Sequence, residues 1–298
     1  MAALATLVWS GSFVTSRALH DSVPPVQQAF WRWLIALAAV APFGASRAWR
    51  QRHLIRRHSG YVLLASLLGV ALYNTLVNQA ALTTPAATMG VVMAASPVLM
   101  ALFERLGGAR LGARRTAGLL AAGAGVALLV CGGSGGSGGS GGAGVGFGAG
   151  GLWMLAATCC FAGYSALLRR RPAGLGGTAF LFTTFLTGTV LLLPAQAVSV
   201  AVQGGFRPVP GTVLPLLYVG VASSAVAFFA WNKAVAVIGA SRAGVVYYLQ
   251  PVCVALLSWA LLGETTGRAA LPAMALVLGG VVVGAGPGRG SRSGSRVR

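Results

Sequence analysis

Acidic residues are almost absent from this chain of 298 residues. Asp21, Glu104 and Glu264 are the only three, against 22 arginines and lysines. Three scattered carboxylates cannot supply the paired acids of a hydrolytic site, and the predicted spans contain no histidine–carboxylate pair and the sequence no phosphate-binding glycine-rich loop with lysine. The composition therefore disfavours an enzyme and excludes an ATP-driven pump within this chain.

Cysteine is also scarce. Cys131, Cys159, Cys160 and Cys253 lie inside or at the edges of apolar runs, and none of them has the spacing of metal ligands. The adjacent Cys159 and Cys160 cannot easily bridge each other. We therefore interpret all four as small apolar residues, and we expect neither a metal nor a cofactor.

Charged residues of either sign make up 8% of the chain, and hydrophobic residues make up 56%. Runs of about 20 apolar residues, the length that crosses a bilayer core, follow one another almost end to end without the alternation of barrel strands. The pattern predicts an all-α integral membrane protein with ten transmembrane helices. The predicted spans are 2–20, 25–43, 60–82, 86–106, 116–131, 151–168, 178–198, 212–237, 240–262 and 270–286.

Basic residues collect in alternate gaps between these spans. With a cytoplasmic N-terminus, 18 of them lie in inside gaps, near the inner ends of the adjoining spans or in the C-terminal tail, Arg207 and Arg268 lie outside, and Arg17 and Arg32 lie within spans. This bias predicts a multi-pass protein of the cell membrane with both termini in the cytoplasm. The net charge of +19 does not indicate nucleic-acid binding, because no basic domain stands apart from the spans.

Two segments of the chain are related copies. Residues 73–98 and 227–252 align without a gap at an offset of 154, with 8 identities in 26 positions, among them Asn78 with Asn232 and Pro97 with Pro251. A repeat within a series of spans is typical of transporters built from two related halves. Because each half holds five spans, an odd number, we expect the second half to be inverted relative to the first.

The repeat defines the domain organisation. We expect a first repeat over 1–131, a Gly/Ser-rich outer linker over 132–150, a second repeat over 151–286 and a basic cytoplasmic tail over 287–298. The linker composition is typical of a flexible tether.

Four short motifs follow one another in a recognisable order. They are Trp9-Ser10-Gly11-Ser12-Phe13-Val14, Ala29-Phe30-Trp31-Arg32, Trp231-Asn232-Lys233-Ala234, and Tyr248-Leu249-Gln250-Pro251-Val252 followed by Leu261-Leu262-Gly263-Glu264. In order and spacing they resemble EamA-type proteins of the drug/metabolite transporter superfamily. The resemblance implies ten helices in two five-helix repeats around a central cavity, and transport of small metabolites, often outward. The first half departs from the pattern, because Gly108-Ala109 stands where the family has Gly-Glu.

The sequence therefore predicts a secondary or facilitative transporter, an exporter of small organic metabolites or amphipathic compounds, that works by alternating access. The alternatives are an integral-membrane enzyme and a structural membrane subunit that does not transport. The expected partners are a small-molecule substrate and the lipid bilayer, without nucleic acid. Glycine-rich faces of the fifth and tenth spans permit close helix packing, and a homodimer is one assembly that they allow.

Polar and aromatic side chains within the spans are the candidate substrate-binding residues, because such groups are costly in lipid unless they face the bundle interior. They are Trp9, Arg32, Tyr73, Asn74, Asn78, Ser96, Tyr164, Trp231, Asn232, Tyr247, Tyr248 and Gln250. The aromatic residues suit amphipathic ligands if they lie deep in the bundle, but near span ends they are ordinary interfacial anchors.

Several of these residues have a second interpretation. Asn78 and Asn232 either bind substrate or hydrogen-bond a neighbouring helix. Arg32 either attracts an anionic substrate, or extends to the interface or binds carbonyls at a helix end. Pro97 and Pro251 are expected to kink the fourth and ninth spans, with or without a role in the site.

Two placements follow from these assignments. We expect Asn78, Asn232, Tyr247 and Gln250 to border one cavity between the halves. We expect Glu264 to be structural, accepting backbone N–H bonds at the start of the tenth span, where a carboxylate is favoured.

The acid inventory generates a first prediction. Proton-coupled carriers generally need an ionisable group deep in the bundle, and all three acids fall in loops or at span ends. In proteoliposomes at clamped voltage, a pH gradient should not drive uphill substrate accumulation. Accumulation that Glu104→Gln or Glu264→Gln abolishes in folded protein would show that one of these acids carries the proton.

Overall fold

A computed structural model describes residues 1–106, 148–238, 247 and 249–263, with isolated positions 117, 121, 124, 272, 275, 276 and 279. The predicted fifth and tenth spans therefore lie almost wholly outside the described residues. So do Tyr248, Glu264, the linker up to residue 147, the C-terminal tail, and the side chains of Pro97 and Glu104.

Every regular element in the described residues is helical. The elements are α1 (Ala2–Ala18), α2 (Pro25–Arg50), α3 (Arg52–Arg57), α4 (Ser59–Ser66), η1 (Leu67–Leu72), α5 (Tyr73–Ala81), α6 (Ala86–Met93), α7 (Ser96–Leu106), α9 (Ala149–Arg169), α10 (Gly177–Gln203), α11 (Pro210–Leu217), η2 (Tyr218–Val226), α12 (Ala227–Ile238) and α14 (Gln250–Leu262), where η marks a π-helix.

Five helical stretches in the described residues are long and apolar enough to cross a membrane. They are Pro25–Arg50, Ser59–Ala81, Ala149–Leu168, Gly177–Gln203 and Pro210–Ala234. The shorter apolar helices include α14, with 13 residues, and α1 has 17 residues. The prediction of an all-helical, multi-pass membrane protein is thus confirmed at this level.

Local sequence sets several helix ends. Proline occupies the first turn of α2 and of α11, where its missing N–H is not needed. Gly263 ends α14 with a left-handed φ of 65°, a conformation that a side chain disfavours.

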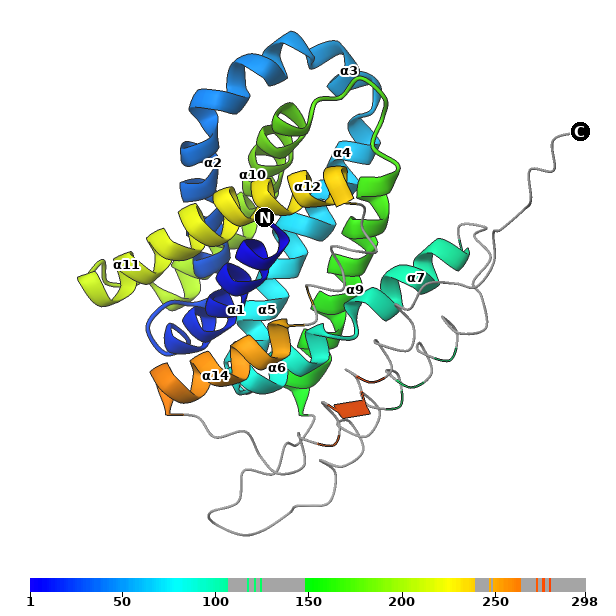
Figure 1. Cartoon of the computed structure of the whole chain (residues 1–298). Helices are drawn as coiled ribbons and strands as arrows, with labels where there is room; N and C mark the ends of the chain where they lie inside the picture. Colours follow the sequence, from blue (N-terminus) through cyan, green and yellow to red (C-terminus); the bar gives the residue numbers. More distant parts are fainter. Residues whose placement is uncertain are drawn as a thin grey trace, which may run out of the picture.

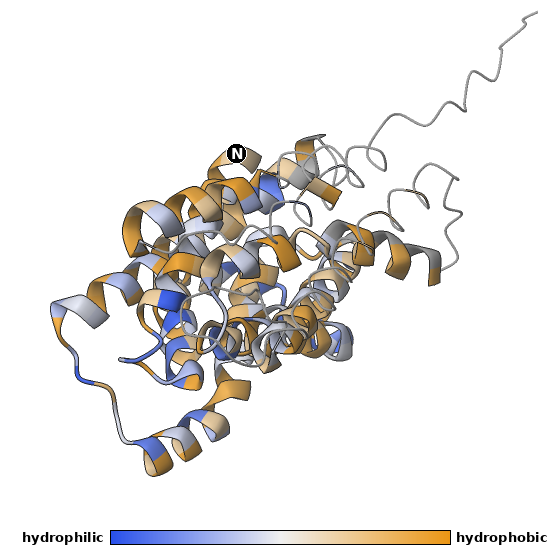
Figure 2. Cartoon of the chain, turned by 90° about the horizontal axis from the view of Figure 1, so that it is seen from below, coloured by the Kyte–Doolittle hydropathy of each residue, from blue (hydrophilic) through white to orange (hydrophobic). Residues whose placement is uncertain are grey.

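The outer faces of the helices are suited to lipid. On α10, Leu186, Val190 and Leu193 are exposed at spacings of three and four residues, while Phe180 and Phe185 are buried. A helix that is apolar on both its inner and outer sides is typical of a membrane span. Figure 2 shows the same property across the molecule, with orange residues along most of the helical ribbons.

Helices from the two ends of the chain pack together. The first helix, α1, lies between α12 and η2 on one side and α14 on the other (Figure 1). Likewise α2 packs along α10, and α9 packs along α5. The interior of the bundle is therefore built from both sequence repeats.

Both repeats contain a π-helical segment at the same place. Shifting η1, residues 67–72, by the repeat offset of 154 gives 221–226, which falls within η2, residues 218–226. Each segment interrupts a membrane-spanning helix immediately before the repeated sequence that holds Asn78 or Asn232. Such segments are rare and frequently lie at functional sites.

The predicted fourth span is not one continuous helix. Helix α6 ends at Met93 and α7 begins at Ser96, with two turn residues between them. Pro97 has no N–H to donate to the carbonyl of Met93, four residues earlier, which explains the break. In the second repeat Pro251 likewise lies in the first turn of α14, after a turn at Leu249.

Close packing of α10 against η1 generates a second prediction. A Cβ at Gly188 would overlap the stiff, β-branched side chain of Val70, whereas a Cβ at Gly60 would meet nothing within 4 Å. We expect Gly188→Ala to destabilise the protein by about 1–3 kcal/mol through overpacking, and Gly60→Ala to cause no loss. Thermal unfolding in detergent compares them, and equal midpoints would contradict this packing.

Candidate functional site

The centre of the bundle is an aromatic cluster. Trp9 of α1 lies in the middle, with its ring centroid 5.4–6.2 Å from four other rings. These four belong to Phe161, Phe228, Trp231 and Tyr247.

Further rings contact this group, among them Trp33 and Phe185 beside Phe228, and two of them are predicted site residues. Tyr73 lies 5.3 Å from Phe161, and Tyr164 lies 6.3 Å from Phe228. We use "aromatic cluster" below for Trp9, Tyr73, Phe161, Tyr164, Phe228, Trp231 and Tyr247. Every predicted aromatic site residue that the structure describes belongs to it, and its members come from α1, α5, α9, α12 and the residue Tyr247 just before α14.

Two members of the cluster were not predicted from the sequence. Phe161 stacks on Tyr247, with an interplanar angle of 16° and centroids 5.8 Å apart. Phe228 contacts Trp9, Tyr164 and other rings. The sequence held a signal for each: Phe161 lies three residues before Tyr164 on the same helical face, and Phe228 occupies the repeat position of Asn74.

Buried polar atoms without partners are found at several of the predicted site positions. In the described part of the chain, the amide nitrogens of Asn74 and Asn232, the hydroxyl of Ser96 and both amide atoms of Gln250 have no hydrogen-bond partner. Buried polar groups are rarely left unpaired. A ligand with polar groups would find these donors and acceptors available.

Tyr247 joins these polar atoms to the aromatic cluster. Its hydroxyl lies close to the side chains of Ser96 and Gln250, although neither makes a hydrogen bond of good geometry. The Ser10 hydroxyl approaches the Gln250 carbonyl at 3.5 Å. One side of the aromatic cluster is therefore polar, an arrangement suited to amphipathic ligands.

Arg32 lies inside the bundle and does not extend to an interface. It is 4% exposed. Its Nε donates to the hydroxyl of Ser224 at 2.7 Å, and its Nη2 donates to the hydroxyl of Ser223 at 2.9 Å. These bonds connect α2 of the first repeat to η2 of the second.

Ser223 also connects this arginine to the aromatic cluster. The indole Nε1 of Trp9 donates to the Ser223 carbonyl at 2.9 Å. The Ser224 hydroxyl donates to the carbonyl of Val219, five residues earlier, at 2.9 Å. The wider turn of η2 thus leaves carbonyls that side chains can reach, and two spans of the first repeat converge on it.

Asn78 lies apart from the cluster and has partners. It accepts a bond from the Ser16 hydroxyl at 3.0 Å, and its Nδ2 donates to the Pro25 carbonyl at 3.1 Å. Ser16 is seven residues beyond Trp9 on α1, or roughly 10 Å along the helix axis. The structure gives Asn78 the helix-joining contacts of its second interpretation, and neither of these two contacts is to Tyr247 or Gln250.

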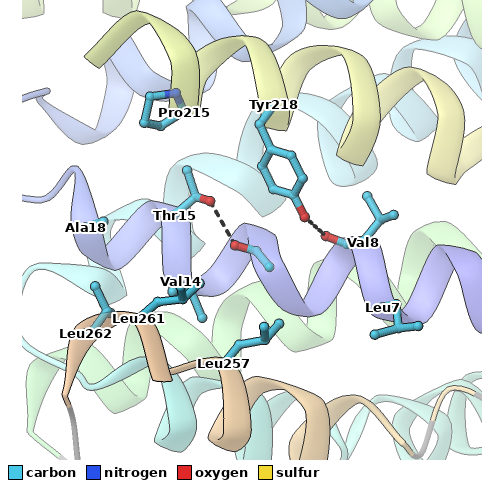
Figure 3. Close-up of a pocket in the computed structure, with 11 residues that line it drawn as sticks. Leu7, Val8, Val14, Thr15, Ala18, Pro215, Tyr218, Leu257, Leu261 and Leu262 are labelled. Atoms are coloured by element: carbon cyan, nitrogen blue, oxygen red, sulfur yellow. Dashed lines mark hydrogen bonds between the residues drawn. The ribbon is translucent and has the colours of Figure 1, made fainter. Parts of the chain in front are cut away.

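Figure 3 shows a groove along α1, between the helices that carry Tyr218 and Leu257. It has a volume of about 550 Å³. Tyr218 reaches from η2 to the Val8 carbonyl at 2.8 Å, and three leucines of α14 approach from the other side. The lining comprises Leu7, Val8, Gly11, Val14, Thr15, Ala18, Pro215, Tyr218, Leu257, Leu261 and Leu262. None of the predicted site residues lines this groove.

A model of the EamA-like transporter family matches residues 1–131 and 148–284. The chain belongs to this family. The resemblance seen in the sequence motifs is confirmed, and the protein is a membrane transporter, as are the relatives described next.

The similarity to two relatives and to one solved structure covers almost the whole chain. An uncharacterised transporter of Archaeoglobus fulgidus is 28% identical over 291 residues, covering 95% of this chain and 93% of the relative. A Streptantibioticus cattleyicolor protein named "probable terminal-alkyne amino-acid exporter" is 28% identical over 286 residues, covering 94% of this chain and 90% of the relative. A crystal structure with 24% identity covers 95% of this chain and 94% of its own, with a TM-score of 0.64, and shares the fold.

The unequal surroundings of the two repeat-related asparagines generate a third prediction. Asn78→Ala leaves the Pro25 carbonyl and the Ser16 hydroxyl without their partner, which should cost about 1–3 kcal/mol of stability. Asn232→Ala removes an amide nitrogen that has no partner, so it should leave stability nearly unchanged while lowering transport.

Thermal unfolding in detergent and uptake per folded molecule in proteoliposomes separate these two effects. Equal destabilisation by both substitutions would show that Asn232 is also a helix-joining residue.

Proposed function

We propose that this transporter binds small amphipathic organic compounds at the aromatic cluster and exports them by alternating access. The single observation that carries the proposal is the cluster itself, in which rings from both repeats meet beside unpaired buried polar atoms. Aromatic rings offer an apolar surface, and the neighbouring amides and hydroxyls offer hydrogen bonds.

A ligand can enter the cluster only when its rings separate. Trp9 is 6% exposed and Tyr247 is 2% exposed, and both contact Trp231 at about 5.5 Å between centroids. Because these residues belong to different repeats, a rocking motion of one half against the other would part them. In this interpretation the structure corresponds to a closed state.

The proposed architecture is ten transmembrane helices in two inverted five-helix repeats, with both termini in the cytoplasm of a cell-membrane protein. Matching π-helices at the repeat offset support it, as does the excess of arginine in the expected inside gaps. Outward transport is proposed because one relative is named as an exporter. We assign the chain no enzymatic activity, since the relatives are named as transporters.

Ring truncation generates a fourth prediction. Trp231→Ala removes a ring from the cluster, whereas Trp259→Ala changes a tryptophan of α14 that is 65% exposed. In proteoliposomes loaded with radiolabelled phenylalanine or leucine, we expect Trp231→Ala to lower saturable efflux at least about tenfold, within the energy of aromatic contacts and burial. Trp259→Ala should stay within about twofold of the wild type.

The proposed substrate class would be contradicted if, for both amino acids, liposomes with the wild-type protein showed no more efflux than liposomes without protein. Equal losses of efflux in the two variants would show that the aromatic cluster has no specific role in transport.

A further inference from the structure

We propose that Arg32 receives a carboxylate group of the transported molecule, which makes this a carrier of organic acids or amino acids with an apolar side. The inference rests on the proposed function of the aromatic cluster. It is carried by the bonds, the charge and the position of one buried side chain.

The hydrogen bonds of Arg32 leave part of its guanidinium available. The group has five N–H donors in a planar fork, and the two serine hydroxyls of η2 accept from Nε and Nη2. Three N–H donors therefore remain beyond these two bonds. A carboxylate can accept two parallel bonds from such a fork.

The charge of Arg32 has no carboxylate to balance it among the described residues. Asp21 is 84% exposed in its loop and lies 3.2 Å from His20, and no acidic side chain contributes to the electrostatic surroundings of Arg32. Serine hydroxyls solvate a cation but do not neutralise it. An uncompensated charge within a membrane bundle is costly, so an anionic ligand would be favoured over a neutral one of the same shape.

The position of Arg32 links it to the aromatic cluster. The Ser223 side chain accepts from Arg32, and the Ser223 carbonyl accepts from Trp9. Tyr73 also lies within electrostatic range of the guanidinium, and its ring contacts Phe161. A molecule with its apolar part among the rings would therefore lie beside the same η2 residue, Ser223, that Arg32 binds.

A different role is available to Arg32 and must be separated from this one. By joining α2 to η2, the arginine could serve only to hold the two repeats together. A helix-joining arginine stabilises the fold equally with any ligand, whereas a carboxylate receptor discriminates between ligands that differ only in that group.

The test measures this discrimination in purified, detergent-solubilised wild-type protein at neutral pH. The probes are 3-phenylpropanoate and 3-phenylpropanamide, which share a ring and a chain and differ in charge. Isothermal titration calorimetry should show the carboxylate binding at least about tenfold more tightly than the amide, a difference of about 1.4 kcal/mol.

Substitution of Arg32 should remove the preference selectively. We expect Arg32→Gln to bring the two affinities within about twofold of each other, while the amide binds as it does to the wild type. Arg32→Lys keeps the charge but not the fork, and it should retain an intermediate preference. This second variant allows the test if Arg32→Gln does not fold.

Arg17→Gln is the matched control, because Arg17 is also an arginine inside a predicted span but donates to the carbonyls of Ala81 and Leu82. It should keep the full preference. Three results would overturn the role of Arg32 without contradicting the aromatic site. They are equal binding of both probes to the wild type, a preference for the carboxylate that persists in Arg32→Gln, and an equal loss of that preference in Arg17→Gln. Binding of neither probe to the wild type would overturn the aromatic site as well.

Discussion

A positive charge inside a membrane bundle must be solvated by the protein, because lipid offers no hydrogen bonds. In this transporter the two serines of η2 solvate Arg32, and this contact connects α2 to η2. The indole of Trp9 binds the backbone of the same segment. Ser223 thus bonds to both Trp9 and Arg32. The position of the aromatic cluster therefore depends on the contact between η2 and the guanidinium group.

The backbone of η2 contributes acceptors to this arrangement. A carbonyl of a regular α-helix binds the N–H group four residues later and can also accept from a side chain of another helix, as the Val8 carbonyl of α1 accepts from Tyr218. In η2 the Ser223 carbonyl accepts from Trp9, and the Val219 carbonyl accepts from the Ser224 hydroxyl. Backbone carbonyls and two serine side chains thus supply polar groups in an apolar span.

Much of the candidate site could be predicted from the sequence, because a polar or aromatic side chain within an apolar span is favourable mainly in the bundle interior or at the membrane interfaces. That reasoning named Trp9, Tyr247 and Gln250. It did not name Phe161, because phenylalanine is also favourable on a lipid-facing surface, and its signal is only its place three residues before Tyr164 on the same helical face. It also treated Asn78 and Asn232 as equivalent. The partners of Asn78 are the Ser16 hydroxyl and the Pro25 carbonyl, whereas the amide nitrogen of Asn232 has no partner among the described residues. The copied residue was visible in the alignment, but the difference between its neighbours appears only when the helices are packed.

The paired π-helices also bear on how such a carrier can diversify over evolution. A π-helical turn accommodates an additional residue within a helix that otherwise has 3.6 residues per turn. Loss of one residue from 67–72 would restore an α-helix and leave Tyr73 and Asn74 in nearly the same orientation, because the wider turn absorbs the additional residue. Single-residue deletions in these two segments would thus change the backbone acceptors beside the site without turning the side chains presented to the interior. The chain contains two such positions, one in each π-helix.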